Sequence, residues 1–160
     1  MTDVRARLAE ILAPMLAELA PSEQPAFVAL AERVAAGRYR VWAEQAKDDE
    51  SRAQLLACAE REEEIASRVE AVTPGAAEIQ ARVEADHPDV AQAYQGLFDG
   101  LALEGQLALQ AQAERIGAAT WRAFAANAEP SVAEIFHRCA ALEEESASTL
   151  EALVGASGRV

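Results

Sequence analysis

Residues 31–43 read AERVAAGRYRVWA, and residues 113–125 read AERIGAATWRAFA. Residues 58–72 read CAEREEEIASRVEAV, and residues 139–153 read CAALEEESASTLEAL. Each copy places glutamates at matching positions. The chain therefore contains the same two-segment unit twice, and this duplication decides which fold it can adopt.

A weaker echo extends the duplication toward the N-terminus. LAEILAPMLAEL at 8–19 matches VAQAYQGLFDGL at 90–101. The internal repeat therefore covers about 8–72 and about 90–153. A length of 160 residues is usual for one domain, so we expect a single domain over residues 1–160.

Composition and charge exclude several classes of function. The chain is 51% hydrophobic but only 5% aromatic, and its net charge is −13. Nucleic acids and anionic membrane surfaces require a basic footprint, so neither is an expected partner. No apolar run approaches the roughly 18 residues of a membrane span, and the charged N-terminus does not resemble a signal peptide. We therefore expect a soluble, cytoplasmic protein.

Apolar residues recur with helical spacing nearly everywhere, which predicts an all-α protein. The breaks between periodic segments contain proline, glycine and aspartate, as at Thr73-Pro74-Gly75. We expect helices at about 3–20, 25–47, 49–72, 76–85, 90–99, 102–128 and 132–154. Two long hairpins joined by a connection at about 73–101 predict a four-helix bundle with a helical crossover and an extra N-terminal helix.

One glutamate interrupts the apolar stripe of each long helix. These residues are Glu32, Glu62, Glu114 and Glu143. They lie at similar distances from their interhelix turns, so antiparallel hairpins bring them to one level of the bundle. The duplication therefore predicts four carboxylates inside the protein.

Four buried carboxylates require compensation, because uncompensated buried charge is very costly. They share protons, pair with arginines or bind cations. Two divalent ions neutralise four carboxylates, with Glu62 and Glu143 as bridging ligands and Glu32 and Glu114 as terminal ones. An all-oxygen shell favours hard ions such as Mn²⁺, Mg²⁺ or Ca²⁺, and it binds Fe²⁺ less tightly than a shell that contains imidazole.

The order of these motifs resembles the rubrerythrins, which belong to the ferritin-like superfamily. ERVAAGRYRVWAEQAKDD followed by AEREEEIA is similar to the first half of a rubrerythrin, and AER…W followed by AALEEESA to the second half. The resemblance covers roughly residues 25–72 and 105–153. It implies a ferritin-like four-helix bundle with a carboxylate-bridged diiron centre at the four glutamates, and an activity in peroxide reduction or ferroxidation.

The chain departs from the rubrerythrin pattern at defined positions. Ile65 and Ser146 stand where the two E-x-x-H motifs have histidine, and Gly117 stands where a further glutamate is often found. His87 and His137 do not replace the missing ligands, and a rubredoxin module is absent. The prediction is therefore a histidine-poor, four-glutamate site for two divalent ions, Fe or Mn, with at most weak oxidoreductase chemistry on peroxide or iron.

A second interpretation stays open, in which the site has decayed and holds no metal. The duplicated arginines Arg33 and Arg115, with Arg40 and Arg122, would then satisfy the four carboxylates. The protein would act as a structural or partner-binding module. In either case a homodimer is expected, because it is the commonest oligomer. Whether the protein is an enzyme is left open.

Four further residues lie beside the glutamates in the repeat. Cys58 and Cys139 precede Glu62 and Glu143 by one turn, and pseudo-twofold symmetry puts them on opposite sides of the glutamate layer. We expect two small buried hydrophobes rather than a disulfide. Tyr39 and Trp121 occupy matching positions, where filling of the core is expected in preference to a hydrogen bond with a carboxylate.

Overall fold

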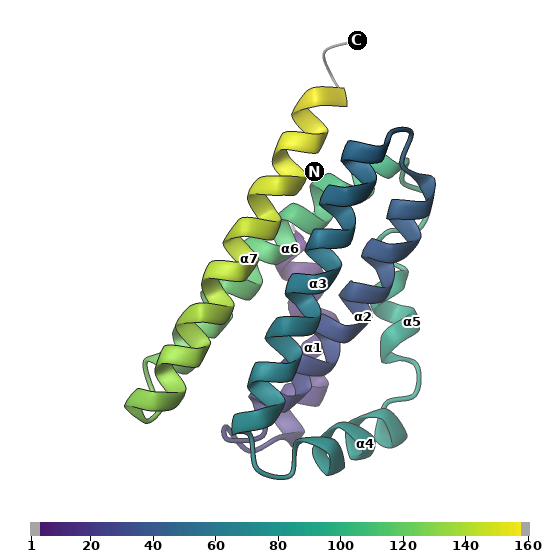
Figure 1. Cartoon of the computed structure of the whole chain (residues 1–160). Coiled ribbons are helices and arrows are strands. Elements are labelled where there is room, and N and C mark those ends of the chain that lie inside the picture. The colour runs from purple at the N-terminus through teal and green to yellow at the C-terminus, as the bar shows by residue number, and fades with distance from the viewer. Residues whose placement is uncertain (1–3, 158–160) are drawn as a thin grey trace.

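The structure, a computed structural model, describes residues 4–157 and contains seven α-helices and no strands within that range (Figure 1). The helices are α1 (Val4–Glu18), α2 (Gln24–Gln45), α3 (Asp49–Val72), α4 (Ala76–Asp86), α5 (Val90–Gln95), α6 (Leu103–Ala125) and α7 (Pro130–Ser157). The all-α prediction is confirmed. None of these helices combines the length and the apolar character needed to cross a membrane.

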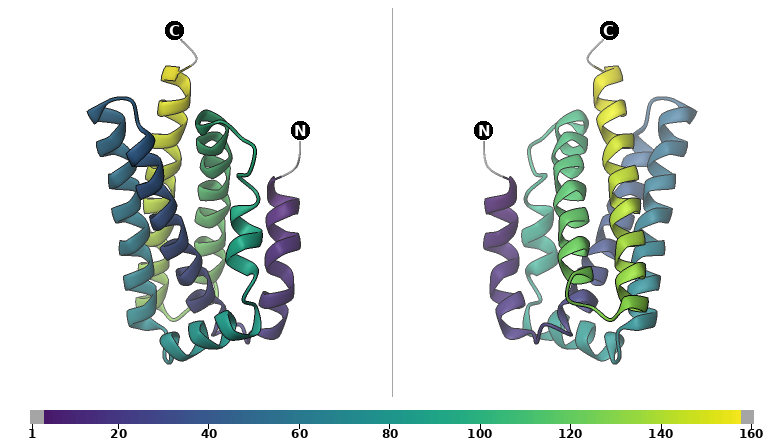
Figure 2. Two further views of the ribbon diagram at one scale, coloured as in Figure 1. Left: turned by 90° about the vertical axis from the view of Figure 1, so that its right-hand side faces the viewer. Right: turned by 90° about the vertical axis from the view of Figure 1, so that its left-hand side faces the viewer.

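Two helical hairpins form the centre of the molecule. Helices α2 and α3 pack against each other, as do α6 and α7, and the two hairpins meet where α3 lies along α7. The short helices α4 and α5 connect one hairpin to the other. Helix α1 lies outside the hairpins, next to α5 and α6 (Figure 2). The predicted pair of hairpins with a crossover and an added N-terminal helix is thus present.

Local sequence explains where the second hairpin helix begins and ends. The Asp48 side chain accepts a hydrogen bond of 2.7 Å from the Ser51 backbone N–H, which caps α3. Asp49 in the first turn adds a negative charge near the positive end of the helix dipole. After α3, Gly75 adopts a positive φ of 69° that glycine reaches without strain, and α4 starts there.

Some helix ends differ from the expected ones. Helix α5 stops at Gln95 rather than near 99, and the chain turns through Gly96 and Gly100, which has a φ of 76°. Helix α7 begins at Pro130, because proline fits the first turn of a helix, where its missing N–H costs nothing. Pro14 lies inside α1 without ending it.

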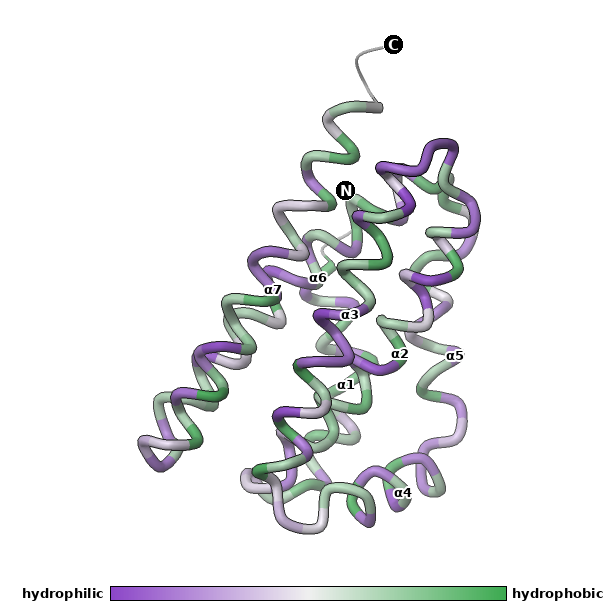
Figure 3. Tube along the Cα trace, in the orientation of Figure 1, coloured by the Kyte–Doolittle hydropathy of each residue, from purple (hydrophilic) through white to green (hydrophobic). Residues whose placement is uncertain are grey.

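Hydrophilic and hydrophobic residues alternate along every helix (Figure 3), and the hydrophobic ones form two large clusters in the hairpins. One cluster contains Trp42, Leu55 and Cys58, and the other contains Trp121 and Cys139. On each long helix the interior glutamate falls between residues of the first cluster and residues of the second. The glutamates therefore occupy one level of the bundle, with a cysteine on either side, as the repeat predicted.

Arginine–glutamate ion pairs repeat on the surfaces of the two hairpins. The pairs are Arg33 with Glu63 and Glu70, Arg40 with Glu63, Arg115 with Glu144 and Glu151, and Arg122 with Glu144. We call these two equivalent sets the arginine clamps. They are half-exposed and contribute about 0–1 kcal/mol each. The prediction that these arginines satisfy the interior glutamates is wrong, because they bond to these surface glutamates instead.

The glutamates next to the clamps join the hairpins to each other. Glu64 lies 3.7 Å from Arg138, and Glu145 lies 3.4 Å from Arg61. Both contacts bridge α3 and α7. Glu64 and Glu145 therefore place negative charges beside arginines across the contact between the hairpins.

Candidate metal centre

Three of the four predicted glutamates come together in the core. Glu32 from α2, Glu62 from α3 and Glu143 from α7 each offer a carboxylate oxygen, and these oxygens lie within 4.8 Å of one another. All three side chains are buried. We call this group the glutamate trio. Its spacing allows a single cation to contact all three carboxylates.

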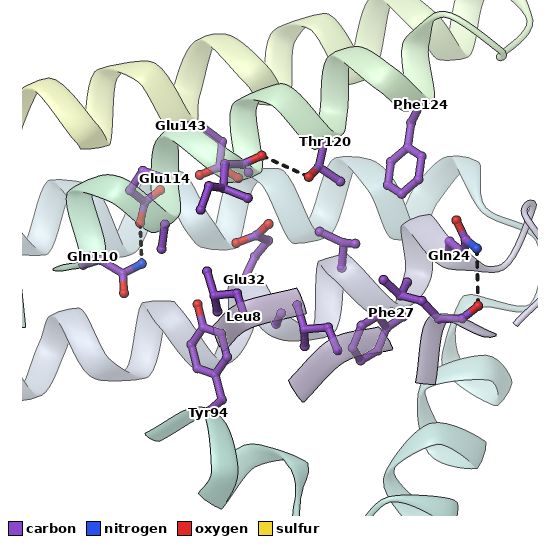
Figure 4. A pocket seen from close by; sticks show the side chains of 17 residues that line it. Leu8, Gln24, Phe27, Glu32, Tyr94, Gln110, Glu114, Thr120, Phe124 and Glu143 are labelled. Atoms are coloured by element: carbon purple, nitrogen blue, oxygen red, sulfur yellow. Dashed lines mark hydrogen bonds between the residues drawn. The ribbon is translucent and has the colours of Figure 1, made fainter. Parts of the chain in front are cut away.

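The fourth glutamate, Glu114 of α6, is buried beside the trio but is held differently. Its Oε1 accepts a hydrogen bond of 2.6 Å from the Tyr39 hydroxyl. The same oxygen accepts a second hydrogen bond, also of 2.6 Å, from the Gln110 amide (Figure 4). Its Oε2 has no hydrogen-bond partner within the described residues. Glu114 as a metal ligand therefore stays a prediction, with one of its oxygens uncommitted.

Only uncharged donors contact the trio through hydrogen bonds in the described part of the chain. The Ser146 hydroxyl donates to Glu62 Oε1 at 3.2 Å, and the Trp121 indole N–H donates to Glu143 Oε1 at 2.9 Å. Glu62 Oε2 has no hydrogen-bond partner among residues 4–157. The negative charges that these carboxyls carry when ionised are therefore not neutralised by an arginine or lysine in direct contact.

Burial raises the pKa values of the three carboxyls of the trio. Burial, together with the nearby charge of Glu114, raises the pKa of Glu32 from 4.5 to about 8. The pKa values of Glu62 and Glu143 also rise well above 4.5, first from burial and then from the neighbouring glutamates. Without a cation, these carboxyls keep protons at neutral pH.

The two positions where the resemblance requires histidine lie near the trio, but neither holds a histidine. Ile65 is fully buried within the apolar cluster around Trp121, and Ser146 donates to Glu62 as described above. His87 bonds instead to Glu18 on the outside of the bundle, and His137 is exposed. The ligand shell available within the described residues is thus made of oxygen atoms.

Gly117 has a structural role that the sequence did not reveal. A Cβ atom at this position would lie 2.5 Å from Glu143 Oε1, 2.8 Å from its carboxyl carbon and 3.0 Å from its Oε2. The Glu143 carboxylate occupies the space that any other residue would fill. The sequence marks Gly117 only as a missing ligand, whereas the structure shows that it makes room for the Glu143 carboxylate.

Sequence reasoning also missed a buried cation near the site. The Arg38 guanidinium lies 4.3 Å from the Phe98 ring centroid and 4.9 Å from that of Tyr94. Its Nη1 donates to Gln110 Oε1 at 3.0 Å, and Gln110 in turn donates to Glu114. The Gln110 amide therefore links the Arg38 guanidinium to the Glu114 carboxylate by hydrogen bonds. The repeat hides this arrangement, because the other copy has threonine at the equivalent position.

Both cysteines are free and buried, as predicted. Burial raises the pKa of Cys58 to about 11 and the pKa of Cys139 to about 12. Since the thiolate is the reactive form, these thiols are inert at neutral pH.

Tyr39 and Trp121 fill the core as expected, but both also donate hydrogen bonds to interior glutamates. We expect Tyr39→Phe to lower the free energy of unfolding by about 1.5–3 kcal/mol, because it removes a buried hydrogen bond to a carboxylate. Urea unfolding at pH 7 in a chelator measures the change. A loss below the uncertainty of that measurement would show that Glu114 does not depend on the Tyr39 hydroxyl.

Comparison of the chain with protein-family models, with curated proteins and with solved structures gives no match.

Proposed function

We propose that the protein is a ferritin-like metalloprotein related in design to the rubrerythrins, which binds divalent cations at its interior glutamates. One observation carries the proposal. The trio gathers three carboxylates in the core, and no arginine or lysine in the described chain bonds to them. In this proposal a cation from solution supplies the positive charge that balances the three carboxylates.

The donor set fits a hard divalent ion. Glu62 Oε2 and Glu114 Oε2 are buried oxygens without partners, and a metal ion is a natural partner for such atoms. Oxygen ligands suit Mn²⁺ and, more weakly, Fe²⁺. In this proposal the trio holds one ion, and Glu114 joins it in holding a second.

When bound, such ions supply Lewis acidity and one-electron chemistry toward peroxide or iron. The side chains around them set their positions. Tyr39 and Gln110 keep one oxygen of Glu114 occupied, which leaves the other oxygen for an ion. Gly117 leaves room for Glu143. Because the trio carries protons when empty, binding of a cation releases them, and affinity rises with pH.

A second candidate is a metal-free module that acts as a structural or partner-binding homodimer. The replacement of both histidines by Ile65 and Ser146 favours it. Since the arginines of the clamps bond to other glutamates, proton sharing is the compensation that this candidate retains for the trio. The two candidates therefore differ in what happens when the trio is neutralised by mutation.

Manganese binding tests the proposal. After chelator treatment and dialysis against Mn²⁺, the wild-type protein should retain bound metal. Two ions per chain are expected when Glu114 is a ligand of the second ion. The double variant Glu62→Gln with Glu143→Gln should retain none, because it lacks two carboxylates of the trio. At a concentration of 100 times Kd, Mn²⁺ should raise the free energy of unfolding of the wild type by about 2.7 kcal/mol.

The matched control is Glu63→Gln with Glu144→Gln. These residues are the next ones along the same helices, but they belong to the arginine clamps. This variant also replaces two carboxyl groups by amides, and it should bind Mn²⁺ as the wild type does. Absence of metal from the wild type, or equal uptake by the trio variant, contradicts the proposal.

A further inference from the structure

Arg38 carries a positive charge in the interior of the protein. The residue is 5% exposed, and the hydrogen bonds that it donates within residues 4–157 go to amide oxygens, at 3.4 Å to Gln95 and at 3.0 Å to Gln110. Its Nη2 has no hydrogen-bond partner among those residues. A guanidinium stays charged at neutral pH, and a buried charge is very costly unless an opposite charge lies close by.

The opposite charge is Glu114, which lies one amide group away. Gln110 accepts the hydrogen bond from Arg38 and donates one of 2.6 Å to Glu114 Oε1, and Figure 4 shows its amide directed at that carboxylate. The trio is not part of this chain of hydrogen bonds, because its donors in the described part of the protein are Ser146 and Trp121. Arg38 therefore places its charge on the Glu114 side of the candidate metal centre.

This charge alters the balance that the four glutamates alone would give. Four carboxylates and two divalent ions are neutral together, and Arg38 adds one positive charge, so the state with two ions is positively charged overall. Like charges repel strongly in a poorly solvated interior, where the effective dielectric constant is low. The second ion, at Glu114, therefore binds against the charge of Arg38, whereas the first ion binds at the trio.

The internal repeat confirms that this charge belongs to one half of the site. Thr120 occupies the position in the second copy that Arg38 occupies in the first. The duplicated glutamates by themselves would give two equivalent ion positions. Arg38 removes that equivalence, because it has no counterpart beside the other copy of the glutamates.

We infer that Arg38 makes the two ion positions unequal, so that the trio holds its ion tightly and the position at Glu114 holds a second ion weakly and exchanges it. While that position is empty, Arg38 balances the charge of Glu114 through Gln110. The inference rests on the proposed metal centre and names the residue that sets the affinity of its second position.

Calorimetric titration of chelator-treated protein with Mn²⁺ at pH 8 tests the inference. The wild type should bind its first ion about tenfold or more tightly than its second. Arg38→Met should increase the affinity for the second ion about tenfold or more and should change the first step less, because it removes the repelling charge. Methionine is a suitable replacement, since it is unbranched and packs well against aromatic rings.

Electron paramagnetic resonance assigns the two steps. An isolated Mn²⁺ ion gives sharp hyperfine lines, and a second Mn²⁺ ion close to it broadens them. In the wild type the sharp lines should persist until the first step is complete. In Arg38→Met the broadened spectrum should appear at a lower ratio of Mn²⁺ to protein.

Two control variants separate the charge of Arg38 from other effects. Arg40→Met removes a positive charge from the same helix, but at a half-exposed arginine clamp where solvent screens it, so both steps should stay unchanged. Gln110→Leu removes the amide link without a change in charge, and it should not increase the affinity for the second ion. If Arg38→Met fails to fold, Arg38→Gln removes the charge and keeps N–H groups that can donate to Gln110.

The outcomes distinguish this inference from the proposed function. One ion bound by the wild type and two by Arg38→Met would support the inference, as would the two-step titration above. Equal affinity of the wild type for both ions, or a second step that neither Arg38→Met nor Arg38→Gln strengthens, would overturn it and leave the trio as a metal site. A wild type that takes up no Mn²⁺ contradicts the metal centre and the inference together.

Discussion

In the presence of a chelator, the protein should be more stable at pH 5 than at pH 8. The native state keeps protons on Glu32, Glu62 and Glu143, whose pKa values are raised, while the unfolded chain gives them up near pH 4.5. Because the native state binds more protons, the free energy of unfolding falls as pH rises. This contribution is complete below pH 4.5 and is lost as pH rises through about 8, the pKa of Glu32.

The expected loss is large. A carboxyl whose pKa rises from 4.5 to about 8 costs on the order of 5 kcal/mol once it is ionised, at about 1.4 kcal/mol per pKa unit. Whole domains have only about 5–15 kcal/mol of stability. Below pH 4.5 the sign reverses, because Arg33 lowers the pKa of Glu70 through a surface ion pair that protonation breaks. Stability should therefore be greatest near pH 5.

Urea unfolding across pH 4 to pH 9 measures this dependence. The Glu62→Gln and Glu143→Gln double variant should show a much flatter curve above pH 5, since it cannot ionise at those positions. Saturating Mn²⁺ should remove the loss in the wild type, because the cation stabilises the ionised carboxylates. A chelated wild type that becomes more stable between pH 5 and pH 8 would refute the proton-bearing trio.

The second large effect is expected for Gly117→Ala. Alanine is the better helix former by about 1 kcal/mol, so the substitution would stabilise an ordinary helix. Here the new methyl group meets the Glu143 carboxylate at 2.5 Å. The carboxylate must move away from the trio, so Mn²⁺ affinity should fall about tenfold or more, as it does when the support of a ligand is removed. The free energy of unfolding should fall by about 1–3 kcal/mol.

Gly37→Ala is the matched control for that substitution. Gly37 lies inside α2, and a Cβ atom there meets nothing within 4 Å. This variant should be more stable than the wild type by about 0.5–1 kcal/mol and should bind Mn²⁺ equally well. Calorimetric titration and urea unfolding of both variants separate the two outcomes. Unchanged Mn²⁺ binding in Gly117→Ala would show that Glu143 is not a ligand.

The repeat made most of the fold predictable. Matching segments such as 31–43 and 113–125 imply matching hairpins, and the interior glutamates follow from helical spacing alone. The spacing argument places Glu32 and Glu62 at one level because both face inward at similar distances from the same turn. It does not give the orientation of a carboxylate, so it does not separate Glu114 from the trio.

The arginine clamps could have been predicted from the sequence, although the sequence analysis paired these arginines with the interior glutamates. Arg33 and Arg40 are seven residues apart, as are Glu63 and Glu70 on the next helix, so each pair lies on one helix face. Arg33 directly follows Glu32 and therefore points about 100° away from it around the helix. That rotation excludes the interior pairing that the metal-free interpretation required.

Other features of the site depend on contacts that a single sequence does not encode. Arg38 is buried because aromatic residues of α2, α5 and the following turn surround its guanidinium. Gln110 joins Arg38 to Glu114 across two helices. Both residues occur in only one copy of the repeat, and the duplication therefore gives no signal for them.

The equivalence of the two arginine clamps has a consequence for folding. Arg33 and Arg40 present the same charges as Arg115 and Arg122, so the clamps do not distinguish the correct partner helix from its copy. Short turns select the correct pairing first, because closing a short loop costs less entropy than closing a long one. Core contacts that occur in only one copy, such as the hydrogen bond from Ser146 to Glu62, then stabilise the correct pairing of helices. Duplication thus left this chain with two exchangeable hairpin partners, and shortening the turn after Gln45, so that α2 and α3 no longer fold back on each other, should favour hairpin exchange between molecules.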